Sequence, residues 1–591
     1  MTDYRAPLQD MQFLLYDVFG IEQEWQQLAG MEELNRELAD ALLEEAARLT
    51  ETLIAPLSRP GDEAGVRFEA GRVFTPPGFV EAWKTYRAGG WIGFAGDPAY
   101  GGQGMPRSLT LMVEEMMHSA SNAFCMYSIL TSGLALALKS HGSDALKSRF
   151  LPLLYSGECA GAMCLTEAHS GTDLGLLRTR AEPAANDTYR ITGTKIFITG
   201  GEQDLTDNIL YLVLARLPDA PEGSAGISMF LVPKRHLNDD NTPAGANGVS
   251  CGSVEHKMGI HASSTCVIHF DNAEGWLVGT LNNGLKAMFT MMNYERLSVG
   301  LQGLACSELA YQKSAAYARD RLQSRAPAGA VNPEQAADPI LAQPDVRRML
   351  LTQRALIEAG RAFALYAGMQ LDRARYGKED NKPRARQLAA LLTPVGKAFL
   401  SDRGLECCLE GQMVFGGHGY IREWGMEQLV RDARIAQIYE GTNGIQALDF
   451  IKRRVQANRG EHVGWVISDM RAFVAAHQHN LNDYAAMLSA SVDRLESVTA
   501  HIVKAGEADA NAGPAAAVDY LAQFGYVLYG WMWARLLVAA NAHDDAEGRY
   551  CLFRRQLADV YFKRLLPRAE MHAQAVESGA NSLMAPSMDA F

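Results

Sequence analysis

The stretch RDARIAQIYEGTNGIQ, Arg431–Gln446, decides how the rest of the chain is interpreted. It predicts the end of one helix, a tight turn and the start of a second helix. Glu440 stands at the turn beside Gly441, where the backbone can pass close to a ligand. Thr442 is predicted to be the N-cap of the second helix. A carboxylate held at a buried helix junction can serve as a general base, although a solvated helix end has the same pattern.

Length and composition indicate a globular protein of several domains. The chain has 591 residues, of which 48% are hydrophobic and 21% charged, and a prior of about 150 residues per domain gives roughly four domains. Its formal net charge of −13 disfavours a role in nucleic-acid binding. The nine cysteines form no CxxC pair, which argues against a zinc site or a disulfide framework. We therefore expect a cytoplasmic protein without a bound metal.

Neither the N-terminus nor the most apolar segment predicts a membrane span. The N-terminal sequence MTDYRAPLQDMQFLL has charges within its first apolar patch and no small-residue cleavage site, so no signal peptide is expected. The apolar segment Tyr520–Ala534 is uncharged over 15 residues, short of the ~20 that a spanning helix needs. We expect a buried bundle helix there. Attachment of the C-terminal module to a membrane surface is the alternative.

The hydrophobic periodicity changes along the chain. Helical spacing dominates to about residue 160, the strand-like runs YRITGTKIFITGG, ILYLVLARL, GISMFLVPK and TCVIHF follow to about 280, and helices then return. The predicted fold class is therefore α+β, mainly α. Its five predicted parts are an N-terminal extension (1–35), a helical domain (36–160), a central β domain (161–280), a helical bundle (281–456) and an additional helical module (457–591).

Within the β region, the strand KIFIT at 195–199 is a second candidate site. Period-two geometry predicts that Phe197 and Thr199 face one side and that Ile196 and Ile198 face the other. An aromatic ring and a hydroxyl two residues apart suit a flat heterocycle. A half-exposed strand without a ligand has the same pattern.

Six segments occur in a fixed order: MCLTEAHSGTD, KIFITGG, HKMGIHASST, NYERLSVGLQG, FGGHGYIRE and RDARIAQIYEGTNGIQ. Together they resemble the flavin-dependent acyl-CoA dehydrogenases over about residues 35–456. The N-terminal extension and the C-terminal module resemble the larger bacterial branch of this family, which acts on fatty acyl-CoA and on 3-methylthiopropanoyl-CoA. The resemblance implies a helical domain, a β-barrel and a helical bundle that hold FAD, and α,β-dehydrogenation of an acyl-CoA thioester.

The resemblance also assigns roles to individual residues. Glu440 would abstract the pro-R α-proton while the β-hydride passes to flavin N5, and the Glu440 N–H would help to receive the developing enolate oxygen. Arg321 would meet the FAD pyrophosphate from a neighbouring subunit. The implied FAD contacts are Met163, Leu165, Thr166, Phe197, Thr199, Arg321, Gln412, Gly416 and Thr442. The implied substrate contacts are Thr172, Asn293, Glu295, Arg296 and Gly441.

Three positions depart from the family pattern. Met413 stands where the family often has Gln, and Gln412 is one residue earlier, so either Gln412 reaches FAD by a local shift or this contact is lost. Ser324–Arg325 replaces the usual Phe-Gly after the YARDR segment, which affects the adenine end of the cofactor site. Gly444 stands where some members carry a Gln that contacts FAD.

Glu295 is a second candidate for the base. It occupies the helix position from which a minority of the family supplies the base, but those members usually lack the Glu of the Tyr-Glu-Gly-Thr motif. Two buried carboxylates sharing one site would repel each other, and one would stay protonated. We therefore assign the base to Glu440 and interpret Glu295 as a substrate-pocket or helix-surface residue.

The expected activity is dehydrogenation of a medium- or long-chain acyl-CoA to the trans-2-enoyl-CoA in fatty acid β-oxidation. The resemblance implies an electron-transfer flavoprotein as electron acceptor and a homodimer. The alternatives are a 3-methylthiopropanoyl-CoA dehydrogenase, an acyl-CoA oxidase, a nitroalkane oxidase-like enzyme, and a scaffold that keeps the fold without the cofactor. Glu440 in place of Asp disfavours the nitroalkane route, and the intact set of Glu440, Thr166 and Thr199 disfavours the scaffold.

Overall fold

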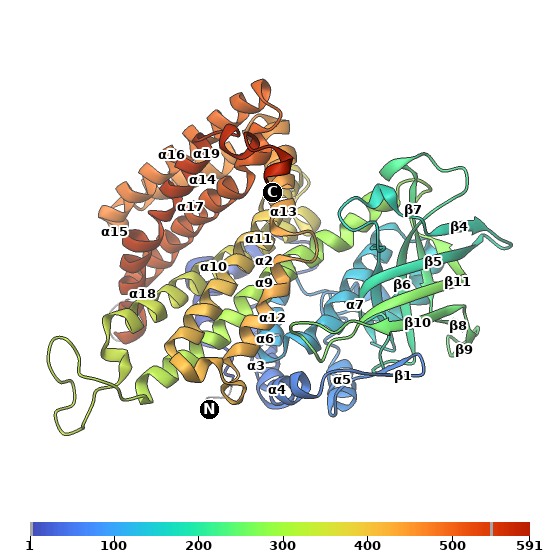
Figure 1. Cartoon of the computed structure of the whole chain (residues 1–591), viewed down its shortest axis with the longest axis horizontal. Coiled ribbons are helices and arrows are strands. Elements are labelled where there is room, and N and C mark those ends of the chain that lie inside the picture. The colour runs from blue at the N-terminus through green and yellow to red at the C-terminus, as the bar shows by residue number, and fades with distance from the viewer. Residues whose placement is uncertain (1–3, 544–547) are drawn as a thin grey trace. The chain divides into compact units, whose positions relative to one another are not determined.

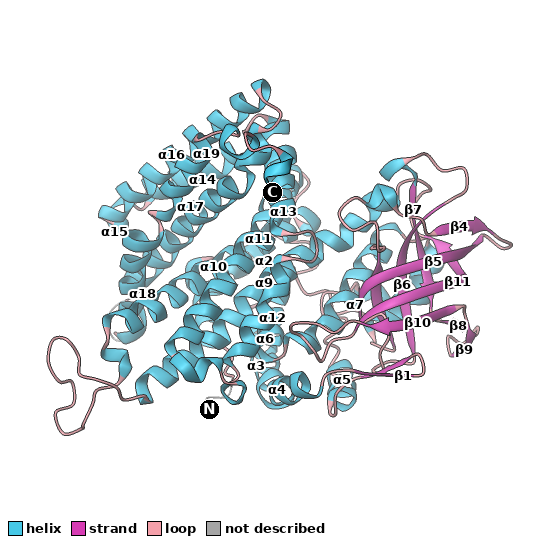
Figure 2. Cartoon of the chain, viewed as in Figure 1, coloured by secondary structure: helices cyan, strands magenta, loops and turns pink. Residues whose placement is uncertain are grey.

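The computed structural model describes residues 4–543 and 548–591 (Figure 1). Residues 1–3, at the start of the predicted N-terminal extension, and 544–547, within the predicted C-terminal module, lie outside the described residues. The chain forms two compact units. We call residues 45–298 the barrel unit, and residues 1–44 together with 299–591 the bundle unit. Helices predominate and the strands of the large sheet lie in the barrel unit (Figure 2), which confirms the predicted α+β, mainly α class.

The large sheet of the barrel unit has seven strands. They are β3 (Cys159–Cys164), β4 (Arg180–Pro183), β5 (Thr188–Thr199), β6 (Asn208–Arg216), β7 (Ile227–Pro233), β10 (Val249–Val254) and β11 (Thr265–Leu277). β11 pairs with β5, β5 with β4, β4 with β6, β6 with β7, and β7 again with β11. This closed ring confirms the predicted barrel. β3 extends it beside β6, and β10 beside β11.

Strand β6 shows why this segment forms a barrel wall. Leu210 and Leu212 belong to the core that helices cover, whereas Ile209, Tyr211 and Val213 belong to the core inside the barrel. Because both faces are buried, the strand is a continuous hydrophobic run and does not alternate with polar residues.

Helices and two small hairpins complete the barrel unit. The hairpin of β1 and β2 was not predicted, because its strands have only three residues each. α7 is long and apolar enough to cross a membrane, but 78% of its apolar window is buried in the protein, as in the core helix of a globular domain. The elements are α4 (Ala55–Ala64), β1 (Arg67–Glu69), β2 (Arg72–Phe74), α5 (Phe79–Ala88), α6 (Arg107–Ala120), α7 (Asn122–His141), α8 (Asp144–Tyr155), β8 (Arg235–Leu237) and β9 (Pro243–Ala246). Helices α3 (Arg36–Leu49) and α9 (Gly284–Asp320) contain the two boundaries between the units.

The bundle unit is helical among its described residues. Its helices besides α3 and α9 are α1 (Leu8–Gln12), α2 (Ile21–Trp25), α10 (Pro344–Tyr376), α11 (Lys382–Val414), α12 (Met426–Arg434), α13 (Asn443–Asp449), α14 (Glu461–Ala476), α15 (Gln478–Leu481), α16 (Asp483–Ala508), α17 (Ala512–Ala542), α18 (Arg549–Val560), α19 (Arg568–Glu577) and α20 (Asn581–Met584). α17 packs against α10, α13, α16, α18 and α19 (Figure 1). It contains the apolar segment Tyr520–Ala534, which is buried except for Ala522. The predicted buried bundle helix is therefore confirmed.

One buried carboxylate ties the N-terminal segment to the rest of the bundle unit. Asp10, in α1, accepts hydrogen bonds from Arg354 of α10 and, at 2.6 Å, from Arg554 of α18. Arg361 lies 3.9 Å away. Burial raises the pKa of Asp10, but these three arginines lower it further, to well below its usual range. Asp10 thus compensates buried positive charge that two long helices bring together.

Replacing Asp10 by Ala is expected to destabilise the protein by about 3–5 kcal/mol, because it leaves buried guanidinium groups with too little negative charge. Urea denaturation followed by circular dichroism measures the loss. The control is Asp493→Ala, which removes an ion pair with Arg471 at a side chain that is 66% exposed and is expected to cost about 0–1 kcal/mol. Equal losses in the two variants would contradict this prediction.

Candidate active site

Glu440 lies in the bundle unit on a sharp turn that ends at α13. Its φ is +56° and that of Gly441 is +80°, so two successive residues have the left-handed conformation. For a glutamate this conformation costs about 1–3 kcal/mol and persists only when the surroundings hold it. The Glu440 side chain is half-buried, and its Oε2 atom is buried. The turn therefore presents the carboxylate in a fixed, partly desolvated position.

Side-chain hydrogen bonds hold this turn. The fully buried Gln446 donates from Nε2 to the Glu440 carbonyl oxygen at 2.8 Å. Thr442 Oγ1 accepts from the Ile445 N–H at 3.4 Å, which confirms the predicted N-cap of α13. The Tyr439 hydroxyl donates to the buried Gln302 of α9. Gln446 was not predicted from the sequence, although its place within the quoted motif was a signal.

Asn443 anchors the first turn of α13 to α11. Its Oδ1 accepts from Lys397 Nζ at 2.8 Å, and its Nδ2 donates to Asp402 Oδ1 at 2.6 Å. Lys397 is fully buried. These bonds give the Glu440 turn a rigid support, because α11 is a long helix packed along α10.

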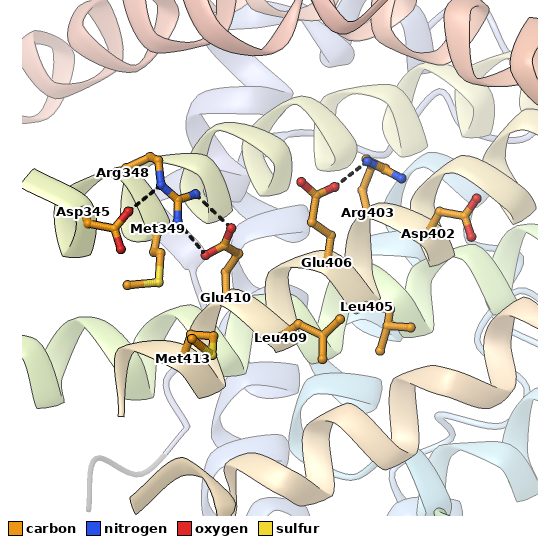
Figure 3. A pocket seen from close by; sticks show the side chains of 10 residues that line it. All are labelled: Asp345, Arg348, Met349, Asp402, Arg403, Leu405, Glu406, Leu409, Glu410 and Met413. Atoms are coloured by element: carbon orange, nitrogen blue, oxygen red, sulfur yellow. Dashed lines mark hydrogen bonds and ion pairs between the residues drawn. The ribbon is translucent and has the colours of Figure 1, made fainter. Parts of the chain in front are cut away.

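A groove of about 560 Å³ runs over α10 and α11 near Asp402 (Figure 3). Arg348 binds Asp345 and Glu410, and a second ion pair joins Arg403 to Glu406. Both arginines of the lining are thus paired, and its four carboxylates leave the groove with an excess of negative charge.

The loop after α11, Phe415–Tyr420, is held by aromatic contacts. Tyr317 of α9 stacks on Phe415 with ring centroids 4.1 Å apart, and its hydroxyl bonds to His418 Nδ1 at 2.9 Å. Tyr317 lies one helical turn before the exposed Arg321. Its contacts therefore bring the last turn of α9 and this loop together. Gly416 is exposed, with a φ of +57°. This role of Tyr317 was not predicted from the sequence.

Gln412, near the end of α11, forms a hydrogen bond with this loop. Its Nε2 donates to the Gly419 carbonyl oxygen at 3.0 Å, and its side chain is half-buried. Met413 is 68% exposed and lines the groove of Figure 3.

In the barrel unit, a β-bulge shapes the end of β5. Lys195 pairs with Ile268 of β11, but Ile198 pairs with Cys266, so β5 has one extra residue. Phe197 takes a left-handed φ of +60° on this bulge and is 60% exposed. Lys195 and Ile198 are both buried, so the predicted strict alternation is wrong here. The bulge cannot be recognised from the alternation of residue types alone.

A buried ion pair positions the segment beside this bulge. Lys195 Nζ donates to the Leu165 carbonyl oxygen and to Glu167 Oε1, both at 2.9 Å. Burial raises the pKa of Glu167, but Lys195 and donors from Thr179 and Arg178 lower it further, to about 2. Burial lowers the pKa of Lys195, and the pairing with Glu167 opposes this effect. The roles of Lys195 and Glu167 were not predicted from the sequence.

The backbone N–H of Ile196 donates to the Thr166 carbonyl oxygen at 2.9 Å, so Thr166 lies beside the bulge. Met163 precedes it in β3, half-buried, and Thr199 ends β5, also half-buried. Among the described residues, the hydroxyls of Thr166 and Thr199 make no intramolecular hydrogen bond. An exposed ring and two available hydroxyls fit the edge and face of a flat heterocycle such as a flavin.

The predicted substrate contacts of the barrel unit differ in exposure. Thr172 and Asn293 are exposed, whereas Arg296 is 7% exposed and donates to Asn293 Oδ1 at 3.2 Å. Glu295 is 1% exposed, so the helix-surface interpretation is wrong. The reason is a notch in α7: a Cβ atom at Gly133 would lie only 2.2 Å from Glu295 Oε1. The carboxylate thus packs where the helix has no side chain.

No group of three or more His, Cys, Asp or Glu side chains within the described residues could hold a metal ion.

The chain matches four family models along almost its whole length. They are described as acyl-CoA dehydrogenase N-terminal domain (36–158), middle domain (162–273) and C-terminal domain (282–456), and as acetyl-CoA dehydrogenase C-terminal like (466–587).

Similar proteins cover the full chain as well. A 3-methylmercaptopropionyl-CoA dehydrogenase from Ruegeria pomeroyi is 38% identical over 99% of this chain and 100% of its own length. The broad-specificity linear acyl-CoA dehydrogenase FadE5 from Mycobacterium tuberculosis is 30% identical over 99% of each chain. An acyl-CoA dehydrogenase from Bacillus anthracis, solved as a complex with FAD, shares the fold with a TM-score of 0.75 at 21% identity, over 93% of this chain and 90% of its own.

Replacing Lys195 by Met is expected to destabilise the barrel unit by about 3–5 kcal/mol, because the buried Glu167 loses its cation. The double variant Lys195→Met/Glu167→Gln is expected to recover at least about 1 kcal/mol of this loss. Urea denaturation of the single and double variants measures the coupling. Lys84→Met is the control, because its ion pair with Glu81 is exposed. A strictly additive double variant would contradict the assigned pairing.

Proposed function

We propose that the chain, which belongs to the acyl-CoA dehydrogenase family, converts an acyl-CoA thioester to the trans-2-enoyl-CoA with FAD as the cofactor and Glu440 as the base. The observation that carries this proposal is the Glu440 turn, which Gln446 and the Thr442 cap hold in a conformation that glutamate rarely adopts.

The proposed reaction breaks two C–H bonds of the acyl group. Glu440 takes the α-proton, which is only weakly acidic, so the carboxylate must be fixed and partly shielded from water. The Glu440 N–H helps to receive the negative charge that develops on the thioester oxygen. Bound FAD supplies the acceptor for the hydride that leaves the β-carbon.

Each unit carries proposed cofactor contacts of its own. In the barrel unit, Phe197 would cover the ring system, and the hydroxyls of Thr166 and Thr199 would bond to its edge. In the bundle unit, Gly416 would allow close approach of the backbone, and Arg321 would compensate the pyrophosphate charge of the FAD of a neighbouring subunit. The Gln412 side chain already donates to the Gly419 carbonyl oxygen. This bond favours the alternative in which the family's Gln contact to FAD is lost over the one in which Gln412 reaches FAD by a local shift.

The proposed substrate is a linear acyl-CoA. Medium or long chains are the sequence-based expectation, and the broad-specificity linear acyl-CoA dehydrogenase that covers the full chain supports it. The second candidate is 3-methylmercaptopropionyl-CoA. It is favoured because the relative that is 38% identical is named as a dehydrogenase of this substrate. We further propose electron-transfer flavoprotein as the acceptor, a homodimer, a role in β-oxidation and a cytoplasmic location. These proposals rest on the family resemblance.

Anaerobic titration with acyl-CoA tests the reaction and the base together. The flavin absorption of the wild type is expected to bleach with straight-chain substrates or with 3-methylmercaptopropionyl-CoA, and a panel of both identifies the preferred class. Glu440→Gln is expected to slow bleaching by at least about 10²–10⁴-fold, because the amide cannot accept the proton. Glu295→Gln is the matched control and is expected to retain bleaching.

If bleaching survives in Glu440→Gln and is lost in Glu295→Gln, Glu295 is the base. A purified protein that contains flavin but bleaches with no acyl-CoA would overturn the proposed reaction.

Replacing Gln446 by Leu tests the positioning of the base. This change keeps the side-chain volume and removes the donor to the Glu440 carbonyl oxygen. We expect kcat to fall about 10-fold or more with a smaller change in KM and an unchanged FAD content, because a small displacement of a reacting group is costly. Gln574→Leu, at an exposed position of α19, is the control. A Gln446→Leu enzyme with wild-type kcat would remove this residue from the catalytic turn.

A further inference from the structure

A second cavity in the bundle unit has no part in the proposed reaction. Its volume is about 460 Å³, and the segment around α2 lines it together with α10, α14 and α17. The N-terminal extension and the C-terminal module therefore both contribute walls. Its chemistry is defined mainly by Arg535 and Trp531 of α17, Tyr366 of α10, Phe473 of α14, and Phe19.

Arg535 lies among three aromatic rings in this cavity. Its guanidinium carbon is 4.6 Å from the ring centre of Trp531, 4.8 Å from that of Phe473 and 5.4 Å from that of Phe19. Cation–π contacts of this kind stabilise the charge but leave the N–H groups at the edge of the guanidinium to bond elsewhere.

Of the charged side chains that the structure describes in this lining, Arg535 forms no direct ion pair, although Asp469 interacts with it electrostatically. Glu24 binds Arg373 through two bonds of 2.5 and 2.6 Å. Asp469 likewise binds Arg384 through two bonds of 2.8 and 2.9 Å. Both carboxylates of the lining are thus committed to other arginines. Burial lowers the pKa of Arg535, whereas hydrogen bonding to Glu24 raises that of Arg373.

Hydrogen-bond donors without an acceptor gather here. Within the described residues, Arg535 Nε and Trp531 Nε1 are buried and have no hydrogen-bond partner. Burial raises the pKa of Tyr366 to about 12, so its hydroxyl stays protonated and can also donate at neutral pH. Buried donors are normally paired, and each unpaired one destabilises a protein. A guanidinium, an indole N–H and a phenol around one cavity together favour an anion.

We propose that this cavity binds a small organic anion whose carboxylate pairs with Arg535 and Trp531 and whose apolar part lies against the aromatic rings. The planar guanidinium offers two parallel N–H donors, a geometry that matches a carboxylate. The cavity volume lies in the range of small-molecule sites with aromatic walls and a few polar groups. The proposal is independent of the acyl-CoA reaction.

Calorimetric and thermal-shift titrations test this site. They use the full-length protein with FAD bound. The probes are sodium benzoate and sodium hexanoate, which separate aromatic from aliphatic carboxylates, with benzamide as the neutral analogue of benzoate. Sodium chloride at equal ionic strength is the reference. We expect at least one carboxylate to bind with a Kd of about 1 mM or tighter and to raise the melting temperature, while benzamide and chloride do neither.

Variants locate the binding. Arg535→Gln is expected to weaken carboxylate binding about 10-fold or more. Arg535→Lys keeps the charge but loses the planar pair of donors, and Trp531→Phe keeps the ring but loses the indole N–H, so each is also expected to weaken binding. If Arg535→Gln does not fold, Arg535→Lys and Trp531→Phe test the proposal. Arg564→Gln, at an exposed position, is the matched control and is expected to bind as the wild type does.

Glu440→Gln is expected to bind the carboxylate unchanged, which distinguishes this cavity from the proposed acyl-CoA site. The proposal is overturned if neither carboxylate binds, if benzamide binds as well as benzoate, or if binding is the same in the Arg535 variants and the wild type. Loss of binding in Glu440→Gln would place the carboxylate in the active site and would equally refute it.

Discussion

The hydrogen bond from Gln446 to the Glu440 carbonyl oxygen fixes a backbone conformation that glutamate rarely adopts on its own. An αL residue other than glycine is unfavourable in isolation, so the surrounding structure must hold it. Gln446 can do this because it is fully buried in α13, and Asn443 fixes the start of that helix to α11. The position of one carboxylate thus depends on the packing of two helices.

In the barrel unit, a buried ion pair has the comparable role of holding a backbone segment in place. The bulge at Phe197 directs an aromatic side chain outward from a strand whose neighbouring residues, Lys195 and Ile198, are buried. A buried lysine without a partner would be strongly unfavourable. Glu167 and the Leu165 carbonyl oxygen satisfy it, and in doing so they fix the segment that carries Thr166. The same ion pair therefore compensates the buried charge and arranges the face that we propose contacts the flavin.

The sequence predicted features that depend on local pattern. The order of helices, strands and helices followed from hydrophobic periodicity, the barrel from the family resemblance, and the Thr442 cap from residue type and position. Features that depend on distant partners were wrong or missed. The alternation at 195–199 failed because the bulge is defined by pairing with β11. For Glu295, the helix-surface alternative failed because its notch at Gly133 lies on another helix. Tyr317 and His418 are 101 residues apart, and nothing in either local sequence indicates their contact.

The C-terminal module packs against the helix that follows the Glu440 turn. Phe450, directly after α13, packs against Tyr520 and Phe524 of α17, with ring centroids 5.7 and 5.2 Å apart. Farther along α17, Trp533 donates from Nε1 to the Ala355 carbonyl oxygen of α10 at 2.9 Å. The helix that holds Arg535 in the second cavity thus also packs against the helix that begins at the Glu440 turn. A ligand that binds only the folded protein stabilises it by mass action. An anion at Arg535 would therefore stabilise the helix that connects the cavity to the proposed base.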